Sequence, residues 1–361
     1  MKIAHVVDSM EVGGAETVVS QMCRLQREQG HTPRVYAVAA LGAIGEQMRQ
    51  EGFEVQAHVG KHFPDAARSF YRIFKESTPD VVHLHNLVPA YYAGMAARIV
   101  GVPSIVSTRH SLVGRPHRIL AELKYATGAA FCDWVVGICE ATRENLKGLH
   151  TVRGGKVVRV YNGAAPLRRA DEAERPEKAG FTLVFVGRLA PVKNHTLLLH
   201  AFQLALASNS GLRLWMVGDG SERKTLEELA ARLGITEQVA FWGQQLDVAP
   251  FFSAADAFIM SSSSEGLPIS LLQAFSLGLP SIVTDVGGMA EAVRFAGAGL
   301  TVPLNDPAGM AEAIVRLAGN GAERERFGAN AAQAFGAHFT LEAMVGAYFD
   351  LYRTAPRTPK P

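Results

Sequence analysis

The chain has 361 residues, of which 48% are hydrophobic and 19% charged, and its formal net charge is +2. Such a composition is typical of a soluble globular protein of two or three domains, which excludes a disordered or fibrous chain and disfavours nucleic acid as a partner. The three cysteines are too few and too scattered for a disulfide framework, and no apolar run has the length of a signal peptide or a membrane span, so we expect a cytoplasmic protein.

Short apolar runs alternate with helix-length segments through the first half of the chain. The predicted strands are residues 3–8, 34–38, 55–58, 81–85, 104–107, 134–138 and 156–160, and the clearest helices are 15–29 and 90–100. Several of these runs are apolar at every position rather than at alternate ones, as in parallel strands that are buried on both faces. The first half therefore predicts a doubly wound α/β unit.

The pattern stops at a polar stretch near residues 163–180 and then restarts. The predicted strands of the second half are residues 181–186, 213–217, 239–241, 257–260 and 281–284. We therefore expect two Rossmann-like domains, residues 1–165 and 166–338, followed by an amphipathic helix over 341–352 and a frayed tail over 354–361. Two such sheets would place the binding loops at the carboxyl ends of their strands, around a shared cleft.

The two halves differ in charge. Residues 1–165 carry 19 Lys/Arg and 14 Asp/Glu, a net charge of +5, whereas residues 166–361 carry 17 and 20, a net charge of −3. Nine of the twelve histidines also lie in the first half. Ordinary scatter explains a difference of this size, and a basic first half that approaches anionic lipid or an anionic acceptor is the sharper alternative.

A pair of glycines follows the first predicted strand. Gly13 and Gly14 allow a tight turn and a close approach of the backbone to a ligand, which would meet the amides of the next helix. The spacing is not GxGxxG and no acidic residue closes the second strand, which disfavours a nicotinamide cofactor. An ordinary turn between strand and helix explains the pair equally well.

Two cations follow the first strand of the second half. Gly187 relaxes the end of that strand, and Arg188 and Lys193 then lie five residues apart, before the next helix begins. A diphosphate needs such a pair, because Arg grips two oxygens in one plane and Lys supplies a mobile point charge. Two solvated surface charges are the simpler alternative, but the position at the carboxyl end of a strand favours a ligand.

The strongest signal is the run SSSSEGLP at residues 261–268, before a helix predicted over 269–277. Pro268 suits a first helical turn and Gly266 a tight entry, so the helix amides offer an anion site. Glu265 is unfavourable beside a phosphate unless it bonds sugar hydroxyls; a stabilising charge at the helix N-terminus, about 0.3–1 kcal/mol, is the simpler alternative. Gln273 would lie about 12 Å from Glu265 if the segment is helical, so both could contact one extended ligand.

Taken together, these segments resemble family 4 of the retaining glycosyltransferases, the type found in bacterial polysaccharide and glycolipid biosynthesis. The runs GRLAPVKN and SSSSEGLPISLLQAFSLGLP resemble its donor site. VGGAE resembles its N-terminal glycine loop, VVHLH its mid-domain strand, VYNGA its exit from the first domain, and VGDGSER and FWGQQLDV its second-domain loops, so the resemblance covers nearly the whole chain. The resemblance implies the GT-B fold, with two Rossmann-like domains across a cleft and residues 339–361 as a helix that crosses back to the first domain, plus a tail.

The resemblance also implies a role for each matching residue. Arg188 and Lys193 would hold the diphosphate, Glu265 would bond hydroxyls of the transferred sugar, and His110 would be the catalytic histidine of the first domain. The donor-binding residues would be Gly13, Gly14, Gly187, Asn194, Gly218, Gly220, Gly243, Gln244, Gly266, Leu267, Pro268, Ile269 and Gln273, and the acceptor-side candidates are Arg109 and Asn162. Without the resemblance, His110 reads as a core or surface histidine. No metal and no cofactor are implied beyond the nucleoside diphosphate-sugar, which would carry UDP or GDP.

Gln273 departs from the family pattern, which usually has a second Glu eight residues after the first, on the ribose hydroxyls. A Gln still forms hydrogen bonds but loses the charge-assisted strength, about 1 kcal/mol. Weaker nucleotide binding or an inactive relative would follow, and the presence of Arg188, Lys193, Glu265 and His110 favours an active enzyme.

The expected reaction is transfer of a hexose to an acceptor hydroxyl with retention of configuration. The acceptor would be a glycan, a lipid-linked saccharide or a small molecule. A nucleotide-sugar epimerase of the same fold and a non-catalytic sugar-nucleotide binder remain as alternatives, with an NAD-dependent dehydrogenase more distant. The basic segment 115–125 predicts either peripheral contact with the inner membrane surface or a solvated helix.

Overall fold

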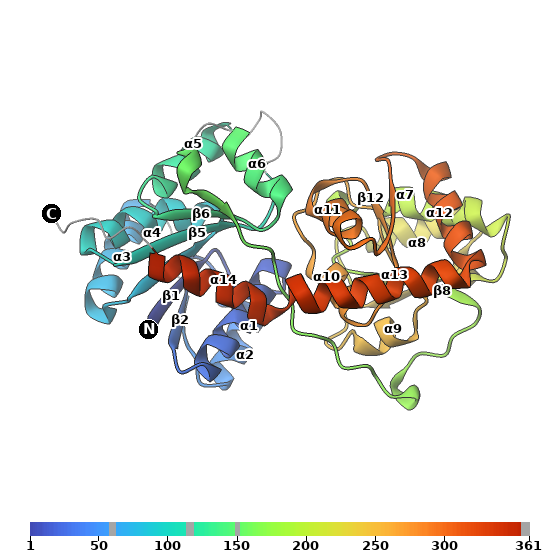
Figure 1. Ribbon diagram of the computed structural model, residues 1–361, viewed down its shortest axis with the longest axis horizontal. Coiled ribbons are helices and arrows are strands. Elements are labelled where there is room, and N and C mark those ends of the chain that lie inside the picture. The colour runs from blue at the N-terminus through green and yellow to red at the C-terminus, as the bar shows by residue number, and fades with distance from the viewer. Residues whose placement is uncertain (58–62, 113–118, 149–151, 355–361) are drawn as a thin grey trace. The chain divides into compact units, whose positions relative to one another are not determined.

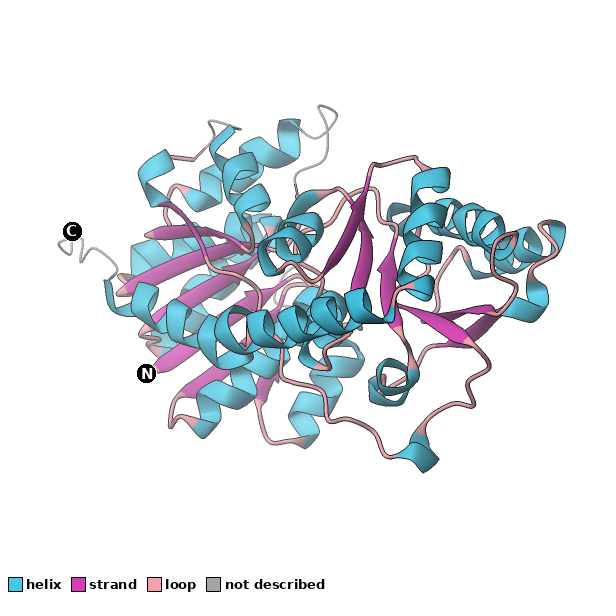
Figure 2. Cartoon of the chain, turned by 45° about the vertical axis from the view of Figure 1, so that its right-hand side comes forward, coloured by secondary structure: helices cyan, strands magenta, loops and turns pink. Residues whose placement is uncertain are grey.

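The computed structural model describes residues 1–57, 63–112, 119–148 and 152–354 of the chain. The chain divides into two compact units, one formed by Met1–Ala164 with Leu341–Pro361 and the other by Ala165–Thr340. Each unit contains one parallel β-sheet with helices packed against it (Figures 1 and 2).

The first unit contains a seven-stranded sheet with the order β3-β2-β1-β4-β5-β6-β7. Its strands are β1 (Lys2–Val7), β2 (Thr32–Ala37), β3 (Glu54–Gln56), β4 (Val81–His85), β5 (Ser104–Arg109), β6 (Trp134–Gly137) and β7 (Val157–Arg159). Its helices are α1 (Gly14–Glu28), α2 (Gly42–Gln50), α3 (Phe63–Ser77), α4 (Leu87–Val100), α5 (Ile119–Ala129), α6 (Glu140–Gly148) and α14 (Leu341–Thr354). The winding direction reverses between the neighbouring strands β1 and β4, which is where doubly wound sheets bind ligands.

The central strands of this sheet are buried on both faces, as their continuous apolar runs predict. Every residue of β4 and of β5 is buried, although β4 carries two histidines. Buried polar groups of this kind need hydrogen-bond partners inside the protein, and these partners form part of the site described below.

Helix α14 belongs to the first unit although it follows the second unit in sequence. The amide of Leu341 donates to the carbonyl of Ala164 at 3.0 Å, at the start of the helix. Two tyrosine hydroxyls of α14 then bond the sheet: Tyr348 lies 2.9 Å from Oγ1 of Thr108, and Tyr352 lies 2.8 Å from Nδ1 of His83.

The second unit contains a six-stranded sheet with the order β10-β9-β8-β11-β12-β13, so its winding reverses between β8 and β11. Its strands are β8 (Phe181–Val186), β9 (Leu212–Val217), β10 (Val239–Gly243), β11 (Ala257–Met260), β12 (Ser281–Thr284) and β13 (Gly299–Val302). Its helices are α7 (His195–Leu206), α8 (Arg223–Arg232), α9 (Ala249–Ala254), α10 (Ile269–Ser276), α11 (Gly287–Ala296), α12 (Pro307–Gly319) and α13 (Gly321–Ala334).

The predicted fold class, two Rossmann-like doubly wound units, is confirmed. Strand β13 is absent from the prediction, because it begins with a glycine and is partly exposed at the sheet edge. Helix α4 begins at Leu87, three residues before its predicted start. Residue 58 of the third predicted strand and residues 355–361 of the predicted tail lie outside the described residues. Within the described ranges, no helix combines the length and apolarity that crossing a bilayer requires.

Candidate active site

The loops that follow β8, β9 and β10 are joined to one another by backbone hydrogen bonds. The amide of Gly187 donates to Val217 at 3.0 Å, and that of Leu189 donates to Asp219 at 2.9 Å. The amide of Gly218 donates to the carbonyl of Gly243 at 2.8 Å. The structure thus brings together three loops that the sequence predicts to contribute to one donor site.

Two glycines permit this close approach. A Cβ atom on Gly218 would lie 1.9 Å from the carbonyl oxygen of Gly187, and one on Gly220 would lie 2.2 Å from that of Leu189. Both distances are far below van der Waals contact, so a side chain at either position would push the loops apart. Glycine here is a packing requirement, whatever ligand the loops bind.

The serine run after β11 is bonded to the short helical turn Pro191–Lys193. Oγ of Ser261 donates to the carbonyls of Lys193 and Asn194, each at 3.0 Å, and the amide of Ser263 donates to Val192 at 2.8 Å. Small hydroxyl side chains therefore hold the two loops at the carboxyl ends of the neighbouring strands β8 and β11.

This packing brings Lys193 and Glu265 into contact across 72 residues of sequence. Nζ of Lys193 lies 2.5 Å from Oε1 of Glu265, and Oγ of Ser262 donates to the same oxygen at 3.1 Å. The two side chains are 15% and 16% exposed, so the pair is largely shielded from solvent. An ammonium group has three N–H donors, so Lys193 can bond Glu265 and an anion together. Arg188 is exposed on the loop after β8.

Helix α10 follows Glu265 with a free N-terminus. Its first amides have no carbonyl of their own helix to bond, as at any helix start. Pro268 is the N-cap in extended conformation, so the expectation that it lies in the first turn is wrong. Because residues 265–268 are not helical, the helical estimate of 12 Å from Glu265 to Gln273 does not apply. The helix ends at Ser276, and Gln273 is half-buried on it.

In the first unit, four histidines gather around the switch point between β1 and β4. Nδ1 of His5 lies 3.1 Å from Nε2 of His85, whose Nδ1 lies 3.0 Å from Nε2 of His110. His5 also bonds Oε1 of Gln26 at 2.9 Å, and His83 lies between the hydroxyls of Thr108 and Tyr352. Sequence reasoning used the VVHLH run only as a strand and missed this cluster, for which the excess of histidines in the first half is the available signal.

Burial keeps these histidines neutral. It lowers the pKa of His5 and of His110 to about 4, and it lowers the pKa values of His83 and His85 well below 6.5. The nearby imidazoles add to the shift at His83 and His85, because two cations so close together repel each other. At neutral pH the four rings act as hydrogen-bonding groups without charge.

The cluster has one histidine at its outer end. His110 follows β5, and its amide donates to Oδ1 of Asn86 at 3.0 Å. Asn86 holds this contact from a positive φ of 70°, a backbone conformation that is uncommon outside glycine. Nδ1 of His110 is shielded from solvent, and no described residue bonds it.

The ring nitrogens of His5, His83 and His85 lie within 4.8 Å of one another, which is close enough to raise the question of a metal site. All six nitrogens of these rings, however, have a hydrogen-bond partner in the protein. The donor set therefore fits a hydrogen-bonded chain better than a coordination sphere.

Four further predicted residues also lie in the first unit. Gly13 is the N-cap of α1, and a Cβ atom on Gly14 would have nothing within 4 Å, which leaves space beside this turn. Arg109 forms a buried ion pair with Glu122 at 2.9 Å, and Asn162 is 4% exposed. The acceptor-side roles of Arg109 and Asn162 remain predictions. Residues 115–118 of the basic segment lie outside the described residues.

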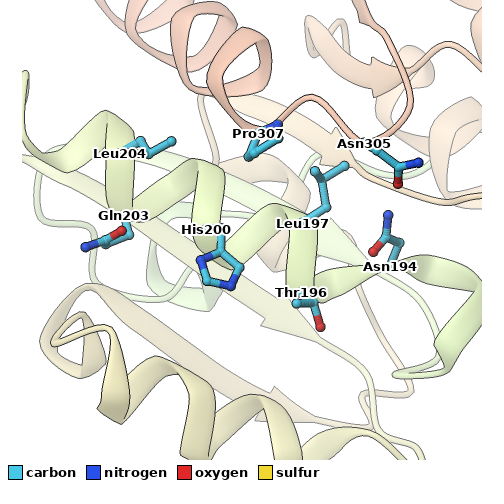
Figure 3. Close-up of a pocket in the computed structure, with 8 residues that line it drawn as sticks. All are labelled: Asn194, Thr196, Leu197, His200, Gln203, Leu204, Asn305 and Pro307. Atoms are coloured by element: carbon cyan, nitrogen blue, oxygen red, sulfur yellow. The ribbon is translucent and has the colours of Figure 1, made fainter.

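The second unit also has a hollow of about 390 Å³ beside α7 (Figure 3). Its lining includes Asn194, His200 and Asn305, and of the predicted donor-site residues it contains only Asn194. Neither Lys193 nor Glu265 lines the hollow.

Comparison with known protein families accounts for both units. Residues 12–166 match the model described as Glycosyltransferase Family 4, and residues 168–334 match Glycosyl transferases group 1. The lipopolysaccharide core biosynthesis glycosyltransferase LpsE of Rhizobium meliloti is 31% identical over 62% of this chain, and the chain spans 65% of its length. The D-inositol 3-phosphate glycosyltransferase of Frankia alni is 31% identical over 74% of each chain.

Among solved structures, Anabaena Alr3699/HepE in complex with UDP-glucose superposes with a TM-score of 0.84. The match covers 98% of this chain and all of that one, at 18% identity. At this identity the likeness shows a common fold alone.

Proposed function

The chain belongs to family 4 of the glycosyltransferases, and from this premise we propose that it transfers a hexose from a nucleoside diphosphate-sugar to an acceptor hydroxyl, with retention of configuration and without a metal ion. The observation that carries the proposal is the shielded contact between Lys193 and Glu265, beside the free N-terminus of α10. A cation, a carboxylate and helix amides together suit a ligand that has both phosphates and sugar hydroxyls.

Each of these groups has a separate task in the proposed reaction. Lys193, Arg188 and the first amides of α10 bind the diphosphate and stabilise the charge that builds on it as the glycosidic bond breaks. Glu265 accepts hydrogen bonds from hydroxyls of the sugar and orients the anomeric carbon. Its negative charge is tolerated near the phosphates because Lys193 and Ser262 already bond it.

The acceptor attacks from the face that the diphosphate leaves, and the departing phosphate oxygen takes the acceptor's proton. His110 contributes a neutral hydrogen bond to the sugar, since burial keeps its pKa near 4. Glu265 is a positioning group for the donor rather than the nucleophile.

The acceptor is a glycan or a lipid-linked saccharide, as the lipopolysaccharide relatives suggest. On α5 the side chains of Leu120 and Leu123 are 69% and 51% exposed, next to the exposed Lys124. An exposed apolar pair with a cation suits peripheral contact with an anionic bilayer. Co-sedimentation with anionic vesicles at low salt should be lost in the double variant Leu120→Ser/Leu123→Ser.

A thermal-shift panel of UDP, GDP, ADP and NAD, with and without EDTA, tests the donor site. A ligand at 100 times its dissociation constant should add about 2.7 kcal/mol to stability. We expect one nucleoside diphosphate to stabilise the chain in EDTA, and Lys193→Ala to abolish the shift. A shift that needs a divalent cation contradicts metal independence, and no shift with any nucleotide would favour a non-catalytic relative.

A further inference from the structure

The described residues contain a continuous chain of hydrogen bonds that starts inside the first unit and ends at His110. Its members are Gln26 on α1, His5 on β1, His85 at the end of β4, and His110 after β5, with successive distances of 2.9, 3.1 and 3.0 Å. Gln26, His5 and His85 are at most 2% exposed, so water cannot substitute for any of these bonds. We refer to these four residues as the histidine chain.

The direction of the first bond determines all the others. Oε1 of Gln26 can only accept, so Nε2 of His5 must carry a proton and donate to it. A neutral imidazole has one N–H, which leaves Nδ1 of His5 as an acceptor for Nε2–H of His85. By the same step, Nδ1 of His85 accepts from Nε2–H of His110, and Nδ1 of His110 is left with a free lone pair.

A separate branch runs through the buried hydroxyl of Tyr352. Burial raises the pKa of this hydroxyl well above its ordinary value. Nε2 of Gln26 is buried and no described residue bonds it, so Gln26 joins the histidine chain through Oε1. Tyr352 continues to His83 and then through Thr108 to Tyr348, without touching the bonds that lead to His110.

We propose that Gln26, acting through His5 and His85, fixes the tautomer of His110 so that Nδ1 is a hydrogen-bond acceptor for a hydroxyl of the transferred sugar. This inference rests on the proposed function for the identity of the ligand, whereas the tautomer of His110 follows from the hydrogen bonds of the histidine chain alone. Among the ring nitrogens of the histidine chain, Nδ1 of His110 is the only one that no described residue bonds. Gln26, His5 and His85 are positioning residues, because none of them needs to touch the sugar.

Histidine-selective ¹⁵N NMR reads the tautomers in the free protein at neutral pH. We expect Nε2–H for His5, His85 and His110, with the His110 signal assigned by its loss in His110→Asn. Gln26→Leu should move His110 toward the Nδ1–H form, whereas Gln26→Glu should preserve Nε2–H because a carboxylate still accepts from His5. Tyr348→Phe, which removes a buried hydroxyl from the other branch, should leave the His110 signal in place.

Ligand binding and turnover complete the test. Addition of UDP-glucose, but not of UDP, should shift the Nδ1 signal of His110. In Gln26→Leu the kcat/KM for UDP-glucose should fall about three- to tenfold, as for one lost neutral hydrogen bond, and Gln26→Glu should restore most of it. Thermal melting of each variant separates this loss from unfolding.

Two outcomes overturn the inference. One is Nδ1–H at His110 in the free protein, which means that the amide of Gln26 has the opposite orientation. The other is a change of the histidine signals on treatment with EDTA, which means that a cation binds the rings. A failure of the nucleotide panel would instead refute the proposed function, because the tautomers are read without any ligand.

Discussion

The two units share one topology but meet their expected ligand with different chemistry. Both sheets reverse their winding at a central pair of strands, β1 and β4 in the first unit and β8 and β11 in the second. At that point the first unit has buried neutral imidazoles, whereas the second has the ion pair of Lys193 and Glu265 and an exposed arginine. One fold thus presents a neutral hydrogen-bonding edge and a charged edge from equivalent positions.

The degree of burial explains the difference. His5, His83 and His85 are at most 2% exposed, where a charge would lose its hydration without an opposite charge to replace it. Lys193 and Glu265 retain about 15% exposure and neutralise each other, so both remain charged groups that a diphosphate or a sugar can engage. The first unit should therefore respond mainly to pH, and the second mainly to salt.

Lowering the pH should produce the largest difference in stability between the two units. The four clustered histidines of the first unit, His5, His83, His85 and His110, have pKa values lowered by burial, so they stay neutral in the native state while the unfolded chain takes up protons below about pH 6.5. Their contribution to stability is present above pH 6.5 and is lost as the pH falls toward 4, by roughly 1–1.5 kcal/mol per pH unit for each histidine. The second unit has one such histidine, His195, whose pKa burial lowers to about 3.

Tryptophan fluorescence can follow each unit in the intact chain. Trp134 reports on the first unit, and Trp215 and Trp242 report on the second. Between pH 6.5 and 5 the denaturation midpoint should fall further in Trp215→Phe/Trp242→Phe, which retains Trp134, than in Trp134→Phe. Equal sensitivity of the two units would contradict the comparison.

Removing the positive charge of Lys193 in the second unit should have the next largest effect, on the rate of transfer. Lys193→Ala should lower kcat of transfer about 10²–10³-fold, as for loss of one preorganised group that stabilises developing charge. Lys178→Ala is the matched control, because Lys178 also pairs with a carboxylate of the same unit, Asp256, at 2.6 Å. A comparable loss of activity in both variants would point to unfolding rather than to the site.

Adding a side chain where the loops of the second unit approach most closely should also have a large effect, in this case on the free energy of unfolding. Gly218→Ala places a Cβ atom 1.9 Å from a carbonyl oxygen and should lower the free energy of unfolding by about 3 kcal/mol. Gly234→Ala is the control: its φ of 69° is also positive, but no atom lies within 4 Å, so we expect about 1 kcal/mol. Urea unfolding measures both, and equal losses would rule out the packing argument.

The smallest effect is expected at Gln273. Gln273→Glu would restore a charge-assisted hydrogen bond to a ribose hydroxyl and should tighten binding of the nucleoside diphosphate about fivefold, equivalent to about 1 kcal/mol. Isothermal titration calorimetry measures the change. Weaker binding in this variant would mean that the position does not contact the ribose.

Much of the fold could be predicted from the sequence because central parallel strands have continuous apolar runs, as in residues 81–85 and 257–260. Strand β13 could not, since a short edge strand that begins with glycine lacks that pattern. The segments of the candidate site were identified from local sequence, but the contact between Lys193 and Glu265 depends on loops 72 residues apart. The histidine chain was missed for the same reason, because its members come from four separate elements.

The most direct test of the account is calorimetric titration of UDP and of GDP at low and high salt, with wild type, Lys193→Ala and His110→Asn. We predict that one nucleotide binds wild type, that its affinity falls with salt and in Lys193→Ala, and that His110→Asn leaves it unchanged. Binding that is insensitive to salt and to Lys193 but lost in His110→Asn would contradict the assignment of the diphosphate to the charged edge.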